Sequence, residues 1–101
     1  MPSSKAEKTY QKDYSILFNA AQQALLEIGA EIESAAEMNG EIKAVKKFQL
    51  IKKAKFTINV NRSGTVSAES SMSALTMGAI DIGRNAKFIE TFFNTLDKRV
   101  M

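Results

Sequence analysis

The chain has 101 residues, of which 45% are hydrophobic and 25% are charged, and a formal net charge of +3. These values fit one small globular domain. Cysteine and histidine are both absent, which excludes a disulfide framework, a thiolate nucleophile, a histidine-dependent triad and a zinc site of the usual kind. We therefore expect a protein that is not an enzyme and that uses no cofactor and no metal.

The N-terminal segment, residues 1–12, is polar and predicts a frayed tail with a short edge strand over residues 7–11. It lacks the apolar stretch of a signal peptide. The longest weakly polar run, residues 72–80, is too short to span a bilayer. We therefore expect a cytoplasmic protein in which residues 13–101 form a single α+β domain.

A first helix is predicted where Asp13 or Ser15 can accept hydrogen bonds from the first free backbone N–H groups. Apolar residues then recur at helical spacing, at Tyr14, Leu17, Phe18, Ala21, Leu25 and Ile28. Gly29 ends this pattern and suits the left-handed position that follows many helices.

Two hairpins are predicted next. The first turns through Met38-Asn39-Gly40, which places Glu37 opposite Glu41 and Ala36 opposite Ile42. In this register the inward-facing residues include Ala30, Ile32, Ser34, Ala36 and Lys46, and the amine of Lys46 is expected to reach outward to water. The second turns through Arg62-Ser63-Gly64, so four strands form an antiparallel meander with one apolar and one polar face. The inward-facing residues of the second hairpin are Ala54, Phe56, Ile58, Val60, Val66, Ala68, Ser70 and Met72.

The last helix is predicted to begin after Asp81, a favourable N-cap residue. Its apolar stripe consists of Phe88, Ile89, Phe92, Phe93, Leu96 and Val100. Because the sheet has one apolar face, both helices are expected to pack on that face. The predicted fold is α+β, in the order (β)αββββα, with an antiparallel meander of four strands, or five with the N-terminal segment.

The run Glu69-Ser70-Ser71, followed by Asp81-Ile82-Gly83-Arg84-Asn85 and an apolar helix, resembles a set of small bacterial domains of unknown function. Their closing segment reads Ser-x-Ser, a short linker and Asp-x-Gly-x-Asn. The resemblance covers about residues 10–100, and it implies an α+β fold without a defined activity. It is also compatible with a TATA-binding-protein-like arrangement of helix and sheet, although a shared fold does not transfer function. Ile82 stands where many relatives carry an aromatic residue, so a shared aromatic-lined pocket is not implied.

The first candidate site consists of Asp81, Gly83, Arg84 and Asn85. One interpretation is structural: Asp81 caps the helix, Gly83 allows close packing and Asn85 bonds to the preceding loop. The other interpretation is an anion or ligand site, in which free N–H groups at the helix N-terminus and the Arg84 guanidinium bind a negative group.

The second candidate is a basic surface. No acidic residue lies between Ile42 and Ala68, whereas this segment contains Lys43, Lys47, Lys52, Lys53 and Lys55. These lysines either form a solvated hairpin that protects a sheet edge or attract nucleic acid or anionic lipid. The predicted outer sheet face carries no aromatic side chain on which bases could stack, which weighs against nucleic acid.

The third candidate is an interaction loop that contains Met72, Leu75, Met77 and Ile80. It is interpreted either as a loop that covers the open end of the core or as an adaptable apolar surface for a partner. Together these features predict a non-catalytic binding or protein-interaction module that self-associates as a homodimer. The alternative is a basic-surface module that binds nucleic acid or an anionic membrane.

Overall fold

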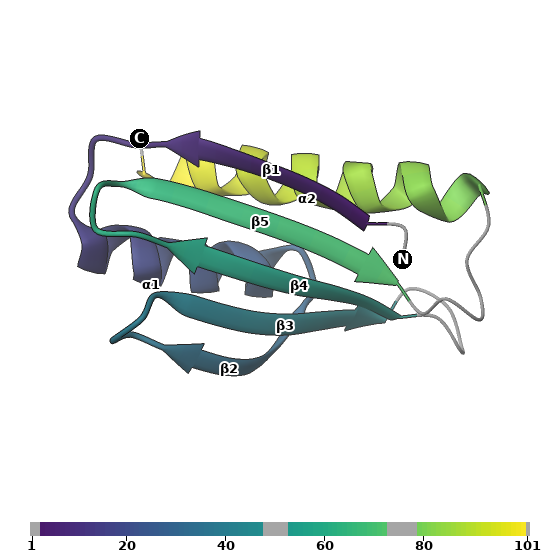
Figure 1. The fold of residues 1–101 in the computed structure, drawn as a ribbon, viewed down its shortest axis with the longest axis horizontal. Helices are drawn as coiled ribbons and strands as arrows, with labels where there is room; N and C mark the ends of the chain where they lie inside the picture. The colour runs from purple at the N-terminus through teal and green to yellow at the C-terminus, as the bar shows by residue number, and fades with distance from the viewer. Residues whose placement is uncertain (1–2, 48–52, 73–78, 101) are drawn as a thin grey trace.

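A computed structural model describes residues 3–47, 53–72 and 79–100, with the side chains of residues 3, 72 and 79–83 excepted. The chain folds in the order β1 (Ser3–Thr9), α1 (Tyr14–Glu27), β2 (Glu31–Ala36), β3 (Glu41–Lys47), β4 (Lys53–Val60), β5 (Thr65–Met72) and α2 (Ala79–Val100). The described strands form one antiparallel sheet in the order β1-β5-β4-β3-β2 (Figure 1). The predicted α+β class and order are therefore confirmed, with β1 as the fifth strand beside β5.

Both helices cover the same face of the sheet, as predicted. Figure 1 looks onto the sheet with α1 and α2 behind it, and the two helices also contact each other. Along β4, buried Ala54, Phe56, Ile58 and Val60 alternate with side chains on the uncovered face. The helices add the other large core side chains, among them Leu17, Phe18, Leu25, Ile89, Phe92, Phe93 and Leu96. Each such side chain contributes about 1.5–3 kcal/mol by leaving water.

Strand β1 differs from the sequence-based expectation in its limits. It covers Ser3–Thr9, rather than 7–11, and pairs residue for residue with 65–71 of β5. The predicted frayed tail therefore belongs to the sheet from residue 3 onward. Its inward positions are Ser4, Ala6 and Lys8, opposite Ser70, Ala68 and Val66. Because these three residues are small or charged, β1 lacks the apolar alternation that marks a strand in a sequence.

The predicted register of the first hairpin is wrong. Ala36, not Glu37, is the last paired residue of β2, and it lies opposite Glu41. The loop covers residues 37–40, and the Gly40 N–H donates to the Ala36 carbonyl oxygen at 2.8 Å. A register shift between Ile32 and Ser34 then places Ile32 opposite Ala44. This arrangement avoids the repulsive Glu37–Glu41 pair, since like charges directly opposite each other destabilise a sheet.

Two predictions about side-chain placement in β2 change with that register. Ser34 and Ala36 are exposed rather than inward-facing, whereas Ala30 is buried and Ile32 is half-buried against the core. In contrast, the predicted register of the second hairpin is confirmed, with Val60 opposite Val66. The Asn61 side-chain oxygen stabilises that turn, because it accepts hydrogen bonds from the backbone N–H groups of Ser63 and Thr65 at 3.1 and 3.0 Å.

Helix α1 begins and ends close to the predicted residues. Asp13 occupies the N-cap position, although its side chain makes no capping hydrogen bond. At the other end Gly29 has φ +91°, and the N–H groups of Gly29 and Ala30 donate to the carbonyl oxygens of Leu26 and Leu25 at 3.0 and 2.9 Å. These two hydrogen bonds form a Schellman motif, which satisfies backbone carbonyl groups that the end of a helix leaves without a partner.

The predicted start of α2 is wrong by a few residues. The helix begins at Ala79, so Asp81 lies within its first turn and is not the N-cap residue. The helix ends with Lys98 and Arg99 in its last turn, where positive side chains interact favourably with the negative end of the helix dipole.

Candidate functional site

Ser70 and Asn85, one from each of two segments singled out in the sequence, meet inside the protein. Ser70 lies on the inner face of β5, and Asn85 lies one helical turn and a half after the start of α2. The Ser70 hydroxyl donates to Asn85 Oδ1 at 2.9 Å, and both residues are fully buried. Asn85 Nδ2 is buried without a partner among the described residues.

This buried pair bears on the first candidate site. The Asn85 side chain points into the core toward β5, whereas Arg84 beside it is only half-buried. Asp81 and Gly83 lie in the early turns of α2, and their side chains are not among those described. The structure therefore brings Asn85 together with Ser70, and an anion site at the four residues stays a prediction.

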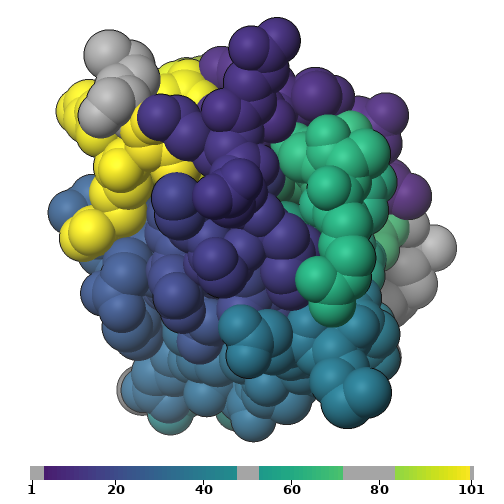
Figure 2. Space-filling view, turned by 90° about the vertical axis from the view of Figure 1, so that its left-hand side faces the viewer, coloured from purple at the N-terminus to yellow at the C-terminus, as the bar shows by residue number. Residues whose placement is uncertain are grey.

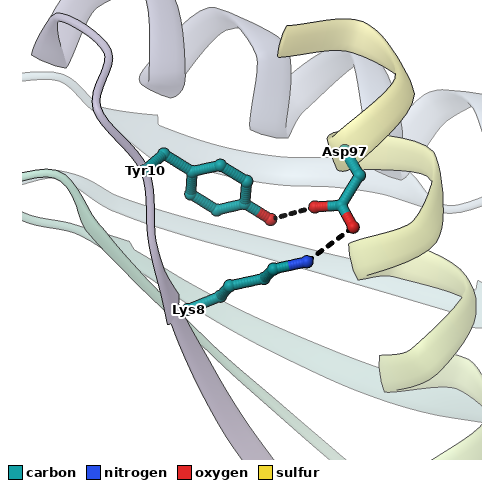
Figure 3. Close-up of polar contacts among 3 residues, drawn as sticks. All are labelled: Lys8, Tyr10 and Asp97. Atoms are coloured by element: carbon teal, nitrogen blue, oxygen red, sulfur yellow. Dashed lines mark hydrogen bonds and ion pairs between the residues drawn. The ribbon is translucent and has the colours of Figure 1, made fainter. Parts of the chain in front are cut away.

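A second polar cluster joins β1 to the end of α2. Asp97 accepts a hydrogen bond from Tyr10 Oη at 2.7 Å on Oδ1 and forms an ion pair with Lys8 Nζ at 2.6 Å on Oδ2 (Figure 3). Burial raises the pKa of Tyr10, and the Asp97 carboxylate that accepts its proton raises it further. Burial also acts to raise the pKa of Asp97, but the hydrogen bonds from Lys8 and Tyr10 outweigh it and hold this pKa below its usual value.

The Lys8–Tyr10–Asp97 cluster is suited to holding the fold together rather than to moving protons. Its tyrosine stays protonated and its aspartate stays ionised at neutral pH, so neither group is poised to exchange a proton there. An open depression of about 340 Å³ lies beside it, lined by Lys8, Tyr10, Gln11, Lys12, Asp97 and Val100. The sequence analysis did not predict this cluster, because Asp97 lies 87 positions after Tyr10 and 89 positions after Lys8. Each of the three is also a polar residue among neighbours that are mostly solvated, so none stands out in the sequence.

The end of the molecule that carries the two hairpin turns has its own polar contacts. The Tyr14 hydroxyl donates to the Glu37 carbonyl oxygen, and the Arg62 guanidinium lies 4.1 Å from the centre of the Tyr14 ring. Figure 2 shows this end, where the connection from β1 to α1 runs beside both turns. Two open depressions of about 550 and 520 Å³ share Asp13 in their lining. The contacts lock the turns onto α1, and they bring no catalytic pair together.

The uncovered face of the sheet carries most of the predicted basic surface. Lys43, Lys47, Lys53 and Lys55 are all exposed there, and Lys47 lies directly opposite Lys53. Lys52 lies outside the described residues. Acidic side chains share the same face at Glu7, Glu31, Glu41 and Glu69. None of the described side chains on this face is aromatic, in agreement with the prediction.

Lys46 occupies the inner face, where its polar end was predicted to reach outward. It lies opposite Ala54, and its Nζ donates to the Ile28 carbonyl oxygen at the end of α1 at 2.7 Å. The amine thus satisfies a carbonyl group at the negative end of the helix dipole, and Lys46 is not available to a ligand on the uncovered face.

The predicted interaction loop is largely outside the described residues. Met72 ends β5 opposite Ala54, and Ile80 is in the first turn of α2. Leu75 and Met77 fall between these elements, outside the part of the chain that the structure describes. This loop therefore stays a prediction.

Among the described residues, no three His, Cys, Asp or Glu side chains cluster in a way that suits a metal ion. No α-helix in the described part of the chain combines the length and the apolar character needed to cross a membrane. No protein-family model matches the chain, and no curated protein matches its sequence. The function must therefore be inferred from the surfaces described above.

Proposed function

We propose that the protein is a non-catalytic binding module that engages a protein partner through the uncovered face of its five-stranded sheet. The observation that carries this proposal is the one-sided packing of the fold. Both helices cover one face, so the other face presents an exposed surface built from all five strands. A face of this extent is large enough for a standard protein–protein interface, to which each partner contributes roughly 800 Å².

The side chains on this face support binding rather than catalysis. They are lysines, glutamates, serines and threonines together with Asn59, Ala36 and Val45, and lysine and glutamate on neighbouring strands provide directional, charge-selective contacts. The chain has no histidine and no cysteine. Ser71 lies opposite Lys55 and Thr57 opposite Lys43, but no hydrogen bond among the described residues of the face joins a hydroxyl to a lysine amine, as activation of a nucleophile requires.

A site-specific photo-crosslinker tests this proposal. We would place it at Thr57, in the middle of β4 on the uncovered face, and, as a matched control, at the exposed Gln23 on the surface of α1. On irradiation in the cells that make the protein, the Thr57 variant should give a discrete covalent adduct that the Gln23 variant does not. Equal adduct patterns from both positions, or none from Thr57, would contradict the proposal.

A polyanion is a second candidate ligand, because Lys47 and Lys53 lie side by side near Lys43 and Lys55. The test is retention on heparin and on anionic vesicles over a salt series, with the Lys47→Gln/Lys53→Gln variant compared with Lys12→Gln/Lys98→Gln, which removes the same charge elsewhere. Earlier elution of the first variant alone would support this candidate, and no retention at low salt would remove it.

A further inference from the structure

The uncovered face carries charges of opposite sign at the two ends of its strands. The paired residues Glu7, Ser67, Asn59 and Glu41 form one continuous row across β1, β5, β4 and β3. The opposite end of the face carries Lys47 beside Lys53. Along β3 the two ends are six residues apart, which is about 20 Å at 3.3 Å per residue. One end of the face is therefore negative and the other positive.

Building on the proposed function, we propose that the partner is a second copy of this chain, packed face to face about a two-fold axis. The axis lies between the two sheets and runs perpendicular to the strands. It places the Glu41 end of each copy over the Lys47 end of the other, so the same charge pair forms twice. An interface of this kind uses one self-complementary patch on both copies.

The geometry of sheet packing permits these pairs. Aligned sheets pack about 10 Å apart and cross at about 30°. Glu41 and Lys47 each lie about 10 Å from the axis, half of their separation along β3. The crossing angle displaces them sideways by about 5 Å, a distance that flexible lysine side chains can span. Thr57, Val45 and Ser71 lie in the two central rows of the face, which they share with Lys43, Lys55 and Glu69.

Charge also favours a second copy over a polyanion. In the described part of the chain, the ion pairs are Lys8–Asp97, Lys87–Glu90 and Arg99–Glu27, so neither Glu41 nor Lys47 forms an ion pair with another described residue. Lys47 and Lys53 repel each other across β3 and β4, and a facing carboxylate relieves that repulsion. A polyanion would meet the same lysines, but it would also be repelled by Glu7, Glu41 and Glu69.

The available area suits a dimer of ordinary size. The molecule measures 39 × 22 × 21 Å, and Figure 1 views it down the shortest axis onto the sheet. The area of a face bounded by the two longer dimensions is comparable to the roughly 800 Å² that each partner contributes to a standard interface. The face contains few apolar side chains, so the association should weaken as salt increases.

Sedimentation equilibrium at several protein and salt concentrations tests the inference. The wild-type protein should dimerise at low salt. Glu41→Lys alone and Lys47→Glu alone should each weaken dimerisation by about tenfold or more, because each places like charges together twice. An equimolar mixture of the two variants should form a heterodimer, since every altered position then faces an opposite charge. The double variant Glu41→Lys/Lys47→Glu should recover the homodimer.

The control is Glu90→Lys, which makes the same charge change on the exposed surface of α2 and should leave the dimer intact. Circular dichroism would verify that each variant is folded. A strict monomer at high concentration, or single variants that dimerise like wild type, would overturn the inference. If the Thr57 crosslinker still captured a different protein, the proposed binding role would stand. An adduct of twice 11.1 kDa from purified Thr57 variant, absent from the Gln23 variant, would support both.

Discussion

Ser70 and Asn85 form the buried polar contact between the sheet and the last helix. The Ser70 hydroxyl donates to Asn85 Oδ1 at 2.9 Å in a region that solvent does not reach. A buried hydrogen bond of this kind specifies how two elements dock, because any other packing leaves both groups unpaired. It thereby fixes where α2 sits along β5.

Replacing Ser70 by alanine should destabilise the protein by about 1–3 kcal/mol, because it leaves the Asn85 oxygen buried without a donor. Urea denaturation followed by circular dichroism measures the change. The control is Ser67→Ala on the uncovered face, which should change the free energy of unfolding by less than about 0.5 kcal/mol. In a double-mutant cycle, Ser70→Ala and Asn85→Leu should be less than additive; strict additivity would show that the two side chains do not interact.

Replacing Asp97 by asparagine should lower the pKa of Tyr10. The carboxylate accepts the phenol proton and opposes a second negative charge beside it, and both effects disappear in the variant. The chain has two tyrosines, so the titration is done in a Tyr14→Phe background, with ultraviolet absorbance reporting tyrosinate. If the titration of Tyr10 were unchanged in Asp97→Asn, the contact with Asp97 would not control the phenol.

Asp97 should also make the free energy of unfolding depend on pH in the acidic range. The pKa of Asp97 in the folded protein is lower than the ordinary value of an aspartate, so the ionised form stabilises the fold. That stabilisation is fully present above the unfolded pKa and is lost as the pH falls through the folded one. The difference in unfolding free energy between wild type and Asp97→Asn should therefore be constant near neutral pH and shrink below about pH 4. A difference that grew on acidification would contradict this sign.

Two glycine substitutions should differ in severity. Gly40 has φ +72°, and a Cβ there would lie 2.0 Å from the Val60 carbonyl oxygen, a backbone atom. Gly29 has φ +91°, but its added Cβ would meet the end of the flexible Lys46 side chain at 2.8 Å. Gly29→Ala should cost about 1–2 kcal/mol from backbone strain alone. Gly40→Ala should cost about 1–3 kcal/mol more because the backbone must also move. Thermal denaturation of the two variants gives the comparison.

The register of the first hairpin was predicted wrongly because its turn sequence alone does not determine it. A three-residue loop ending at Gly40 was the simplest choice for an Asn-Gly sequence, and it gave the correct position for that glycine, which has φ +72°. The actual loop is one residue longer and is offset by the register shift near Ile32. Such a shift depends on how β2 must pack against α1 and β3 together, and local turn preferences do not contain that information.

Local patterns in the sequence alone determined much of the fold. The alternation of apolar residues in β4 and β5, the helical spacing in α1 and α2, and the turn at Gly64 predicted these elements because each depends on residues close together in the chain. The exposed lysines on β3 and β4 followed from the same alternation. Packing of both helices on one face followed from the presence of one apolar sheet face.

Only the tertiary structure revealed the limits of strand β1 and its pairing with β5, the Lys8–Tyr10–Asp97 cluster and the opposed charges at the two ends of the uncovered face. Each joins residues that are distant in sequence, as Lys8 and Asp97 are at 89 positions apart. Residues 3–9 form a strand because β5 offers them a row of backbone groups for hydrogen bonding. The side chains of these residues have little preference for a strand of their own. Pairing of this kind is decided by the partner, and so a single segment of sequence does not encode it.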